Sequence, residues 1–406
     1  MTDSFGPRSG EEIGTQQPFS SQETWPAVPD GLAQIGYILL AALGAVIAFA
    51  GGVYLVWTLF WGDQTSDGAL ALAVTAVGLA TAAASVRAFR PARWRELFLA
   101  SEWVWLGLMV VVWIAGALVV GLLPRWQHRA LPPLIVLGAA LVSLWFLSAT
   151  LRGLRAPVER AQLSRRLVPG HVVLLSTAVS ASFSTVIALI LEGVFIAGVM
   201  AVMLFTLRLL GDLDTLALIQ RAARDPETLA RLEEMIVSSP VAMAGLGCIL
   251  VFVAPAIEEA TKALPLLFFA RQKARLSERT AILIGVAGGV GFAFAENVGY
   301  LSLLADNWWL IFWLRAAGAI MHGAASGFIG RAWYRGLKQG RWGAMLVDLC
   351  KGWGIHGFWN ALAVLVAWFA YQEAIMGVLF CVVVGLVPLA LLFLVLARWG
   401  IWVSER

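Results

Sequence analysis

Charged residues are scarce in this sequence. They make up 13% of the 406 residues, whereas apolar residues make up 60%; an average soluble domain has about 25% charged residues. Several apolar runs exceed the roughly 18 residues that indicate a membrane span. The composition therefore excludes an ordinary soluble protein. It predicts an all-α, polytopic helical membrane protein embedded in a lipid bilayer.

Cysteines are also few, and their positions do not suggest a disulfide or a cysteine metal site. Cys248, Cys350 and Cys381 all lie within apolar runs. An odd number of cysteines in such runs is typical of small apolar side chains in packed helices. The net charge of +4 does not indicate a nucleic-acid partner, because the basic residues gather in short segments between the apolar runs.

The beginning of the chain lacks apolar periodicity. Residues 1–31 are rich in Ser, Gln, Pro and Gly, and no charged segment is followed there by an apolar one. This composition predicts a disordered tail without a signal peptide.

The apolar runs that follow predict about ten transmembrane helices. Their expected limits are 33–60, 69–88, 103–123, 133–151, 173–207, 241–269, 281–303, 308–331, 343–370 and 375–397. Arg and Lys concentrate after the second, fourth, sixth and eighth runs, whereas acidic residues such as Asp63, Asp306 and Glu373 occupy alternate connections. The positive-inside rule therefore predicts a multi-pass protein of the cell membrane with both termini, including the 1–31 tail, in the cytoplasm.

The runs divide into two membrane regions. Residues 32–172 form a four-helix N-terminal region, and residues 173–406 form a core that carries the intramembrane polar groups. Within the core, residues 208–240 alternate Leu and Ile with Arg, Asp and Glu and contain Pro226. This pattern predicts an extracytoplasmic amphipathic loop.

Three charged residues lie inside the sixth apolar run, in Pro255-Ala-Ile-Glu258-Glu259-Ala-Thr-Lys262. A charged side chain at the centre of a membrane helix costs at least about 2.5–3.5 kcal/mol, so such residues usually have a partner or a function. Glu258 and Glu259 lie four and three residues before Lys262, so either carboxylate can meet the lysine. We expect Lys262 to pair with one glutamate and leave the other for water.

The next three spans each carry further polar residues near mid-membrane. They are Phe292-Ala-Phe-Ala-Glu296-Asn297, His322-Gly-Ala-Ala-Ser326-Gly327 and His356-Gly-Phe-Trp-Asn360. Only four histidines occur in the chain, and His322 and His356 are the two within spans. With a rise of about 1.5 Å per residue and alternating helix direction, these groups and Glu258 lie at compatible depths. The sequence therefore predicts one shared polar site.

The predicted site suits activation of a water molecule. A glutamate in a low-dielectric site can serve as general base, and the imidazole and amide of His356 and Asn360 can donate hydrogen bonds to an oxyanion. Alternatively, Glu296, His322 and His356 form a His₂Glu set that binds zinc and leaves Glu258 or Glu259 as the base. Both schemes describe amide hydrolysis, and the residue types do not choose between them.

At these residues the sequence resembles the PrsW family of intramembrane proteases, which are distantly related to CAAX prenyl endopeptidases. The resemblance covers about residues 240–370. Its motifs are Glu258-Glu259-x-x-Lys262, Phe292-x-x-x-Glu296-Asn297, His322 and His356-x-x-x-Asn360. It implies cleavage of single-pass membrane proteins, such as an anti-sigma factor, on the extracytoplasmic side, and it implies a metalloprotease. Glu296 stands where the FxxxH motif of the CAAX-type relatives has a histidine, so their water activation does not transfer directly.

Other functions fit the sequence less well. A proton- or ion-coupled transporter would also place Glu and His at mid-membrane but predicts inverted repeats, and a non-catalytic membrane scaffold leaves the shared polar site unused. A rhomboid-like serine protease would use Ser326, which lacks the first glycine of GxSG, and the HExxH and GxGD motifs are absent.

Several further intramembrane residues remain open between structural and functional roles. They are Glu192, Arg315 and the Asp348/Lys351 pair. Gly285 and Gly289 have GxxxG spacing, which predicts close helix packing.

Overall fold

The computed structural model describes residues 31–61, 65–87, 102–159, 170–209, 238–270 and 277–399, with isolated residues between 219 and 234. The predicted tail at 1–31, except for its last residue, and most of the predicted amphipathic loop at 208–240 lie outside these described residues. Within them the elements are all helical. The fold is therefore the predicted all-α one.

The main helices follow the expected spans closely. They are α1 (Gly31–Trp61), α2 (Thr65–Arg87), α3 (Glu102–Leu122), α4 (Gln127–Glu159), α5 (Gly170–Val179), α6 (Thr185–Leu209), α9 (Pro240–Cys248), α10 (Ala254–Lys262), α11 (Leu264–Ala270), α12 (Glu278–Leu303), α13 (Trp308–Trp333), α14 (Trp342–Tyr371), α15 (Ile375–Phe380) and α16 (Val387–Trp399).

Nine helical segments of the described chain are long and apolar enough to cross a membrane. The helix at the remaining expected span, α13, has 26 residues and carries Arg315 and His322; it is not among these nine. The protein is therefore a polytopic membrane protein.

Several long spans contain a wide helical turn. The π-helical turns η2 (Ser180–Ser184) and η3 (Ile249–Val253) join α5 to α6 and α9 to α10. The sixth span then bends at Ala263, just before Pro265 in α11. Proline lacks a backbone N–H and interrupts the hydrogen bonds of a helix, which accounts for this bend.

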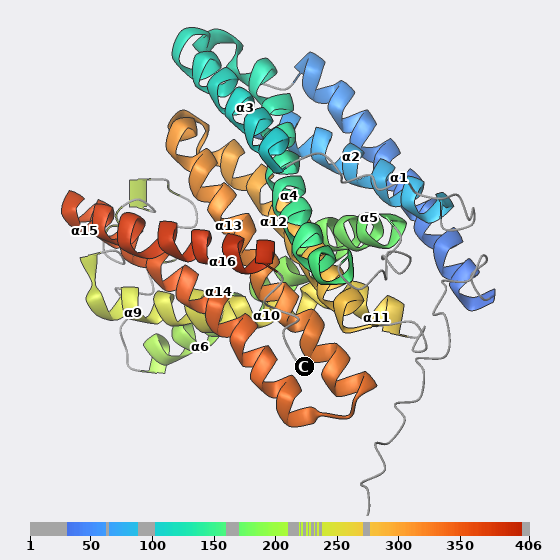
Figure 1. Cartoon of the computed structure of the whole chain (residues 1–406). Coiled ribbons are helices and arrows are strands. Elements are labelled where there is room, and N and C mark those ends of the chain that lie inside the picture. The colour runs from blue at the N-terminus through green and yellow to red at the C-terminus, as the bar shows by residue number, and fades with distance from the viewer. Residues whose placement is uncertain are drawn as a thin grey trace, which may run out of the picture.

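The centre of the molecule is α12, which packs against α13, α4 and α5 (Figure 1). In its most apolar window 89% of the residues are buried, against 6% in the span Val172–Thr206 that contains α6. Figure 1 shows α1 and α2 side by side at one edge and α6, α9 and α15 at the other. The polar residues of α12 therefore lie where protein, rather than lipid, surrounds them.

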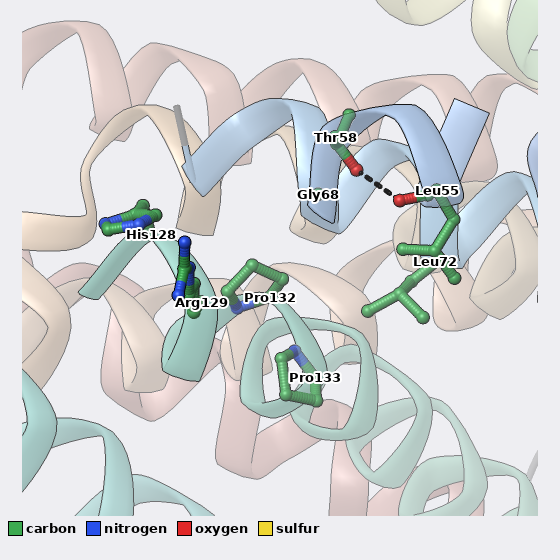
Figure 2. Close-up of a pocket in the computed structure, with 8 residues that line it drawn as sticks. All are labelled: Leu55, Thr58, Gly68, Leu72, His128, Arg129, Pro132 and Pro133. Carbon is green, nitrogen blue, oxygen red and sulfur yellow. Dashed lines mark hydrogen bonds between the residues drawn. The ribbon is translucent and has the colours of Figure 1, made fainter. Parts of the chain in front are cut away.

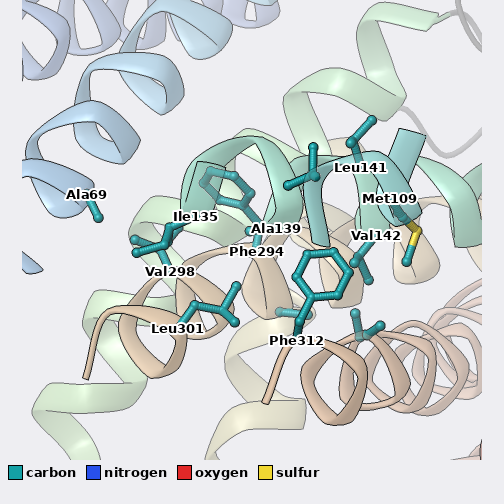
Figure 3. Packing of buried hydrophobic residues seen from close by; sticks show 14 of the residues in the cluster. Ala69, Met109, Ile135, Ala139, Leu141, Val142, Phe294, Val298, Leu301 and Phe312 are labelled. Carbon is teal, nitrogen blue, oxygen red and sulfur yellow. The ribbon is translucent and has the colours of Figure 1, made fainter. Parts of the chain in front are cut away.

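The N-terminal helices share a core with α12 and α13. Figure 3 shows Ile135 and Val142 of α4 beside Val298 of α12 and Phe312 of α13, with Met109 of α3 in the same cluster. These side chains are at most 5% exposed. Helices α2, α3 and α4 thus support the helices that carry the polar site.

Two glycines set how closely α12 and α13 approach. A Cβ atom on Gly285 would lie 2.2 Å from Ser326 O, and one on Gly289 would lie 2.3 Å from His322 O. Both distances are too short for any side chain, so only glycine permits this packing. The predicted role of the GxxxG spacing is confirmed, and it places His322 and Ser326 directly against α12.

A cleft of about 260 Å³ lies between α1, α2 and α4 (Figure 2). His128 and Arg129, in the first turn of α4, line it with Pro132. The cleft shares no lining residue with the predicted polar site.

Candidate active site

The backbone before the two glutamates is shaped by Pro255. This residue has no N–H to donate to a carbonyl one turn earlier, so a carbonyl of η3 needs another donor. Asn360 Nδ2 donates to Leu250 O at 2.9 Å. Trp353 Nε1 donates to Phe252 O, also at 2.9 Å. Two side chains of α14 therefore hold the turn from which Glu258 and Glu259 project.

Lys262 binds three acceptors at once. Its ammonium group lies 3.0 Å from Glu258 Oε2 and 2.9 Å from Glu259 Oε1. It also lies 2.8 Å from His322 Nδ1 and 4.3 Å from the centre of the Phe292 ring. The expectation that Lys262 pairs with one glutamate is wrong, because the residues three and four positions before it both face it on this helix.

Glu259 is held at both carboxylate oxygens. Oε1 lies 2.9 Å from His356 Nδ1, and Oε2 accepts a hydrogen bond from Ser326 Oγ at 2.9 Å. With Lys262, this carboxylate has three donors and is only 3% exposed. Glu259 therefore orients His356 and has little freedom to take a proton from water.

A second carboxylate–histidine pair lies on the other side of Lys262. His322 Nε2 lies 2.7 Å from Glu296 Oε2. Because an ammonium group can only donate, His322 Nδ1 is the acceptor and the ring proton is assigned to Nε2. Arg315 completes the pair by donating to Glu296 Oε2 at 2.8 Å and to Asn297 Oδ1 at 2.9 Å.

Three acceptor atoms face one another beside the lysine. Glu258 Oε2 lies 3.7 Å from His356 Nε2 and 4.0 Å from His322 Nδ1. Because His356 Nδ1 faces the Glu259 carboxylate, its proton is assigned there and Nε2 is left as an acceptor. Lys262 already donates to two of these three atoms, Glu258 Oε2 and His322 Nδ1, so another cation bound here would compete with its ammonium group.

Comparison with known proteins identifies the family of this chain. The family model described as "PrsW family intramembrane metalloprotease" matches residues 168–392, which is more than half of the chain and includes all the site residues. The chain belongs to the PrsW family. It is therefore an intramembrane protease and a multi-pass membrane protein. Searches of curated proteins and of solved structures give no significant match.

For a PrsW metalloprotease, the residues that could hold the metal are Glu258, His322 and His356, whose ligand atoms all lie within 4.8 Å of one another. Two imidazoles and one carboxylate are a known zinc ligand set. Tetrahedral bonds of about 2.0–2.1 Å put ligand atoms roughly 3.4 Å apart, so these three need to move only a little closer. In each histidine, the ring nitrogen that is not in this trio lies beside a carboxylate, which is Glu296 for His322 and Glu259 for His356. Metal-binding histidines usually have such a partner. The donor set therefore fits a metal ion.

This trio differs from the expected one in its carboxylate. The sequence predicts Glu296 beside His322 and His356, whereas the structure brings Glu258 to that position and places Glu296 behind His322. The exchange has a simple cause. His322 Nδ1 faces α10, and His322 Nε2 faces Glu296 on α12. Glu258 on α10 therefore lies on the side of His322 where His356 is, whereas Glu296 lies on the opposite side.

Two residues that hydrogen-bond the glutamates of this site were not assigned to it from the sequence. Arg315 and Ser326 bind Glu296 and Glu259, respectively. They lie seven residues before and four residues after His322, which puts all three on one face of α13. That spacing is the signal that could have identified them.

Proposed function

We propose that this protease hydrolyses a peptide bond in a single-pass membrane protein, with Glu258 and His356 holding the attacking water. One observation carries the proposal: the acceptor atoms of Glu258, His322 and His356 converge beside Lys262. Glu259 is held at both oxygens, which leaves Glu258 as the carboxylate able to accept a proton.

In the proposed reaction, the water oxygen adds to the scissile carbonyl carbon while Glu258 accepts one of its protons. His356, held by Glu259, accepts a hydrogen bond from the same water and directs it. The C–N bond then breaks, and the proton on Glu258 passes to the leaving nitrogen, which gives a carboxyl group and an amine. The second amide hydrogen of Asn360 is the donor proposed for the carbonyl oxygen.

In a metal-bound form of the site, for which we propose Zn²⁺, Glu258, His322 and His356 would hold the ion, and Glu258 would then be a ligand rather than the base. When bound, the ion supplies a Lewis acid that polarises the carbonyl and acidifies water. Lys262 donates to two of these ligands, so metal binding competes with its ammonium group.

A groove beside the site supports a membrane-spanning substrate. It has a volume of about 390 Å³ and is lined by apolar residues of α9, η3 and α14, including Gly247, Val251, Ala361 and Trp368. The same two spans carry Glu258 and His356. We infer that the apolar segment of the substrate docks here, so Ala361→Trp should raise KM and leave kcat nearly unchanged.

We further propose that residues 173–406 form the catalytic unit and that the protein lies in the cell membrane with cytoplasmic termini. Cleavage would then occur on the extracytoplasmic side, in a substrate that resembles an anti-sigma factor. The charge pattern of the connections and the position of the family match support this arrangement.

Cleavage of tagged reporters tests the proposal. Single-pass membrane proteins carrying a different tag at each end are co-expressed with the wild-type chain, with Glu258→Gln or with Glu259→Gln. We expect a cut fragment only with the wild type, while all three proteins accumulate in the membrane. Full cleavage by both variants would contradict the proposed function. Elemental analysis of the purified wild type and of His322→Ala then identifies the metal.

A further inference from the structure

The segment α5–η2–α6 carries a buried polar stripe that the site described above does not use. Ser180, Ser184 and Glu192 lie at intervals of four and eight residues, with Ala188 between the last two. Residues four apart share a helix face. Ser180, Ser184 and Ala188 are at most 1% exposed, whereas the neighbouring Leu189 is 62% exposed. The stripe therefore faces the protein on a helix that otherwise faces outward.

The polar atoms of this stripe lack partners in the part of the chain that the structure describes. Ser180 Oγ, Ser184 Oγ and Glu192 Oε1 are buried there without a hydrogen bond. Other hydroxyls of the same segment behave differently, since Ser182 donates to Ala178 O at 2.7 Å and Ser176, Thr177 and Thr185 bond backbone carbonyls in the same way. A buried polar group without a hydrogen-bond partner is unfavourable, so the stripe calls for a small polar ligand.

The stripe faces the active site. The turn η2 packs against α10 and α12, and α6 packs against α10. A Cβ atom on Gly288 would lie 2.9 Å from Lys262 O and 3.9 Å from Ser180 Oγ, which places this serine beside the end of α10. The carboxylate of Glu192 is within electrostatic range of Glu258. Ser180 therefore lies beside the end of α10, and Glu192 is close enough to α10 to feel the charge of Glu258.

We propose that Ser180, Ser184 and Glu192 bind a row of water molecules that supplies Glu258. This inference rests on the proposed function, because hydrolysis consumes one water for each bond cut and Glu258 is only 7% exposed. A buried water makes about three hydrogen bonds, usually to groups that are otherwise unsatisfied. Ionisable residues inside membranes commonly face water-filled cavities. Glu192 is half-buried and is the most accessible member of the stripe.

Cysteine labelling tests the water row without requiring catalysis. Cys248, Cys350 and Cys381 are first replaced by alanine. Ser180→Cys, Ser184→Cys and Glu192→Cys are then compared with Leu189→Cys and Ser182→Cys in proteoliposomes treated with a small charged methanethiosulfonate. Because the thiolate is the reactive form, only positions in contact with water react quickly. We expect the three stripe positions to react at least about tenfold faster than both controls, with Glu192→Cys fastest.

Equal labelling of stripe and control positions would overturn the water row, whatever the outcome of the cleavage experiment. Kinetics provide the second measurement. The double variant Ser180→Ala/Ser184→Ala should lower kcat about tenfold at unchanged KM, whereas Ser182→Ala should leave both constants unchanged. Glu192→Gln, which still binds water, should keep more activity than Glu192→Leu. Unchanged kcat in the double variant and in Glu192→Leu would also overturn the inference.

Discussion

Two buried ionic clusters connect the same helices, α12, α13 and α14, and they are built in opposite ways. The first is the active-site cluster around Lys262. The second, here called the arginine cluster, consists of Glu278, Arg331, Arg335 and Asp348. Arg331 binds both oxygens of Asp348, at 3.0 and 2.6 Å, and Arg335 binds Asp348 at 3.0 Å and Glu278 at 3.3 Å. Asp348 is fully buried.

The difference lies in the balance of donors and acceptors. The arginine cluster has two carboxylates and two guanidinium groups, and its central carboxylate is bound bidentately. The active-site cluster has three carboxylates and two imidazoles but only Lys262 and Arg315 as cations. Donors and acceptors are matched in the arginine cluster, whereas the active-site cluster has more acceptors than cations and can accept hydrogen bonds from water as well. We therefore expect the two clusters to respond to substitution in opposite ways.

The largest expected effect is on turnover. Glu258→Gln removes the proposed base and should lower the rate of reporter cleavage by about 10²–10⁴-fold. The same change removes one surplus negative charge, so the melting temperature of the purified protein should not fall. Scanning fluorimetry in detergent and the tagged-reporter assay measure the two effects on one preparation. If the variant cleaves normally, or melts far below the wild type, the cluster is structural rather than catalytic.

The arginine cluster should show the reverse pattern. Asp348→Asn leaves Arg331 and Arg335 buried without their shared carboxylate, and breaking such a network costs about 3–5 kcal/mol of stability. Turnover per folded molecule should stay at the wild-type level. The control is Lys351→Gln, because this half-exposed lysine lies 3.9 Å from Asp348 and should contribute less than about 1 kcal/mol. A stable Asp348→Asn protein with impaired turnover would contradict the proposed division.

The contrast also explains what the sequence could and could not reveal. Glu258, Glu296, His322 and His356 were identifiable because a polar residue within an apolar span stands out from its neighbours. Depth along each span is readable from the sequence, but the rotation of each helix is not. Gly285 and Gly289 allow α12 and α13 to touch, and in this packing Glu296 lies behind His322. The exchange of Glu296 for Glu258 in the histidine trio depends on this rotation.

Serines illustrate a second limit. Ser180, Ser182 and Ser184 look alike in the sequence, since serine in a membrane helix usually bonds its own backbone, as Ser182 does. Only the packing of η2 against α10 and α12 separates them. In the same way, Asp348 and Lys351 have the spacing of a pair, yet Arg331 and Arg335 from α13 and η6 (Tyr334–Lys338) are the closer partners.

A smaller effect is expected from the carboxylate behind His322. Glu296→Gln keeps a side chain of the same shape but removes the charge that orients His322, and loss of such a partner typically weakens metal binding about 10–100-fold. Competition with a chelator of known affinity measures the change in Kd for Zn²⁺. Glu278→Gln, in the arginine cluster, serves as the matched control and should bind the metal as the wild type does. Equal metal affinities for the two variants would place Glu296 outside the site.

The smallest effect should come from the bond that holds the π-helical turn. Trp353→Phe retains the aromatic contact with Phe252, whose ring lies 6.2 Å away, but loses the N–H that donates to Phe252 O. One such bond is worth about 1 kcal/mol, so kcat should fall no more than about fivefold while KM is unchanged. Trp342→Phe, at an exposed position of α14, should change neither constant. If Trp353→Phe shifts KM alone, α14 acts on the substrate groove rather than on the turn that carries Glu258.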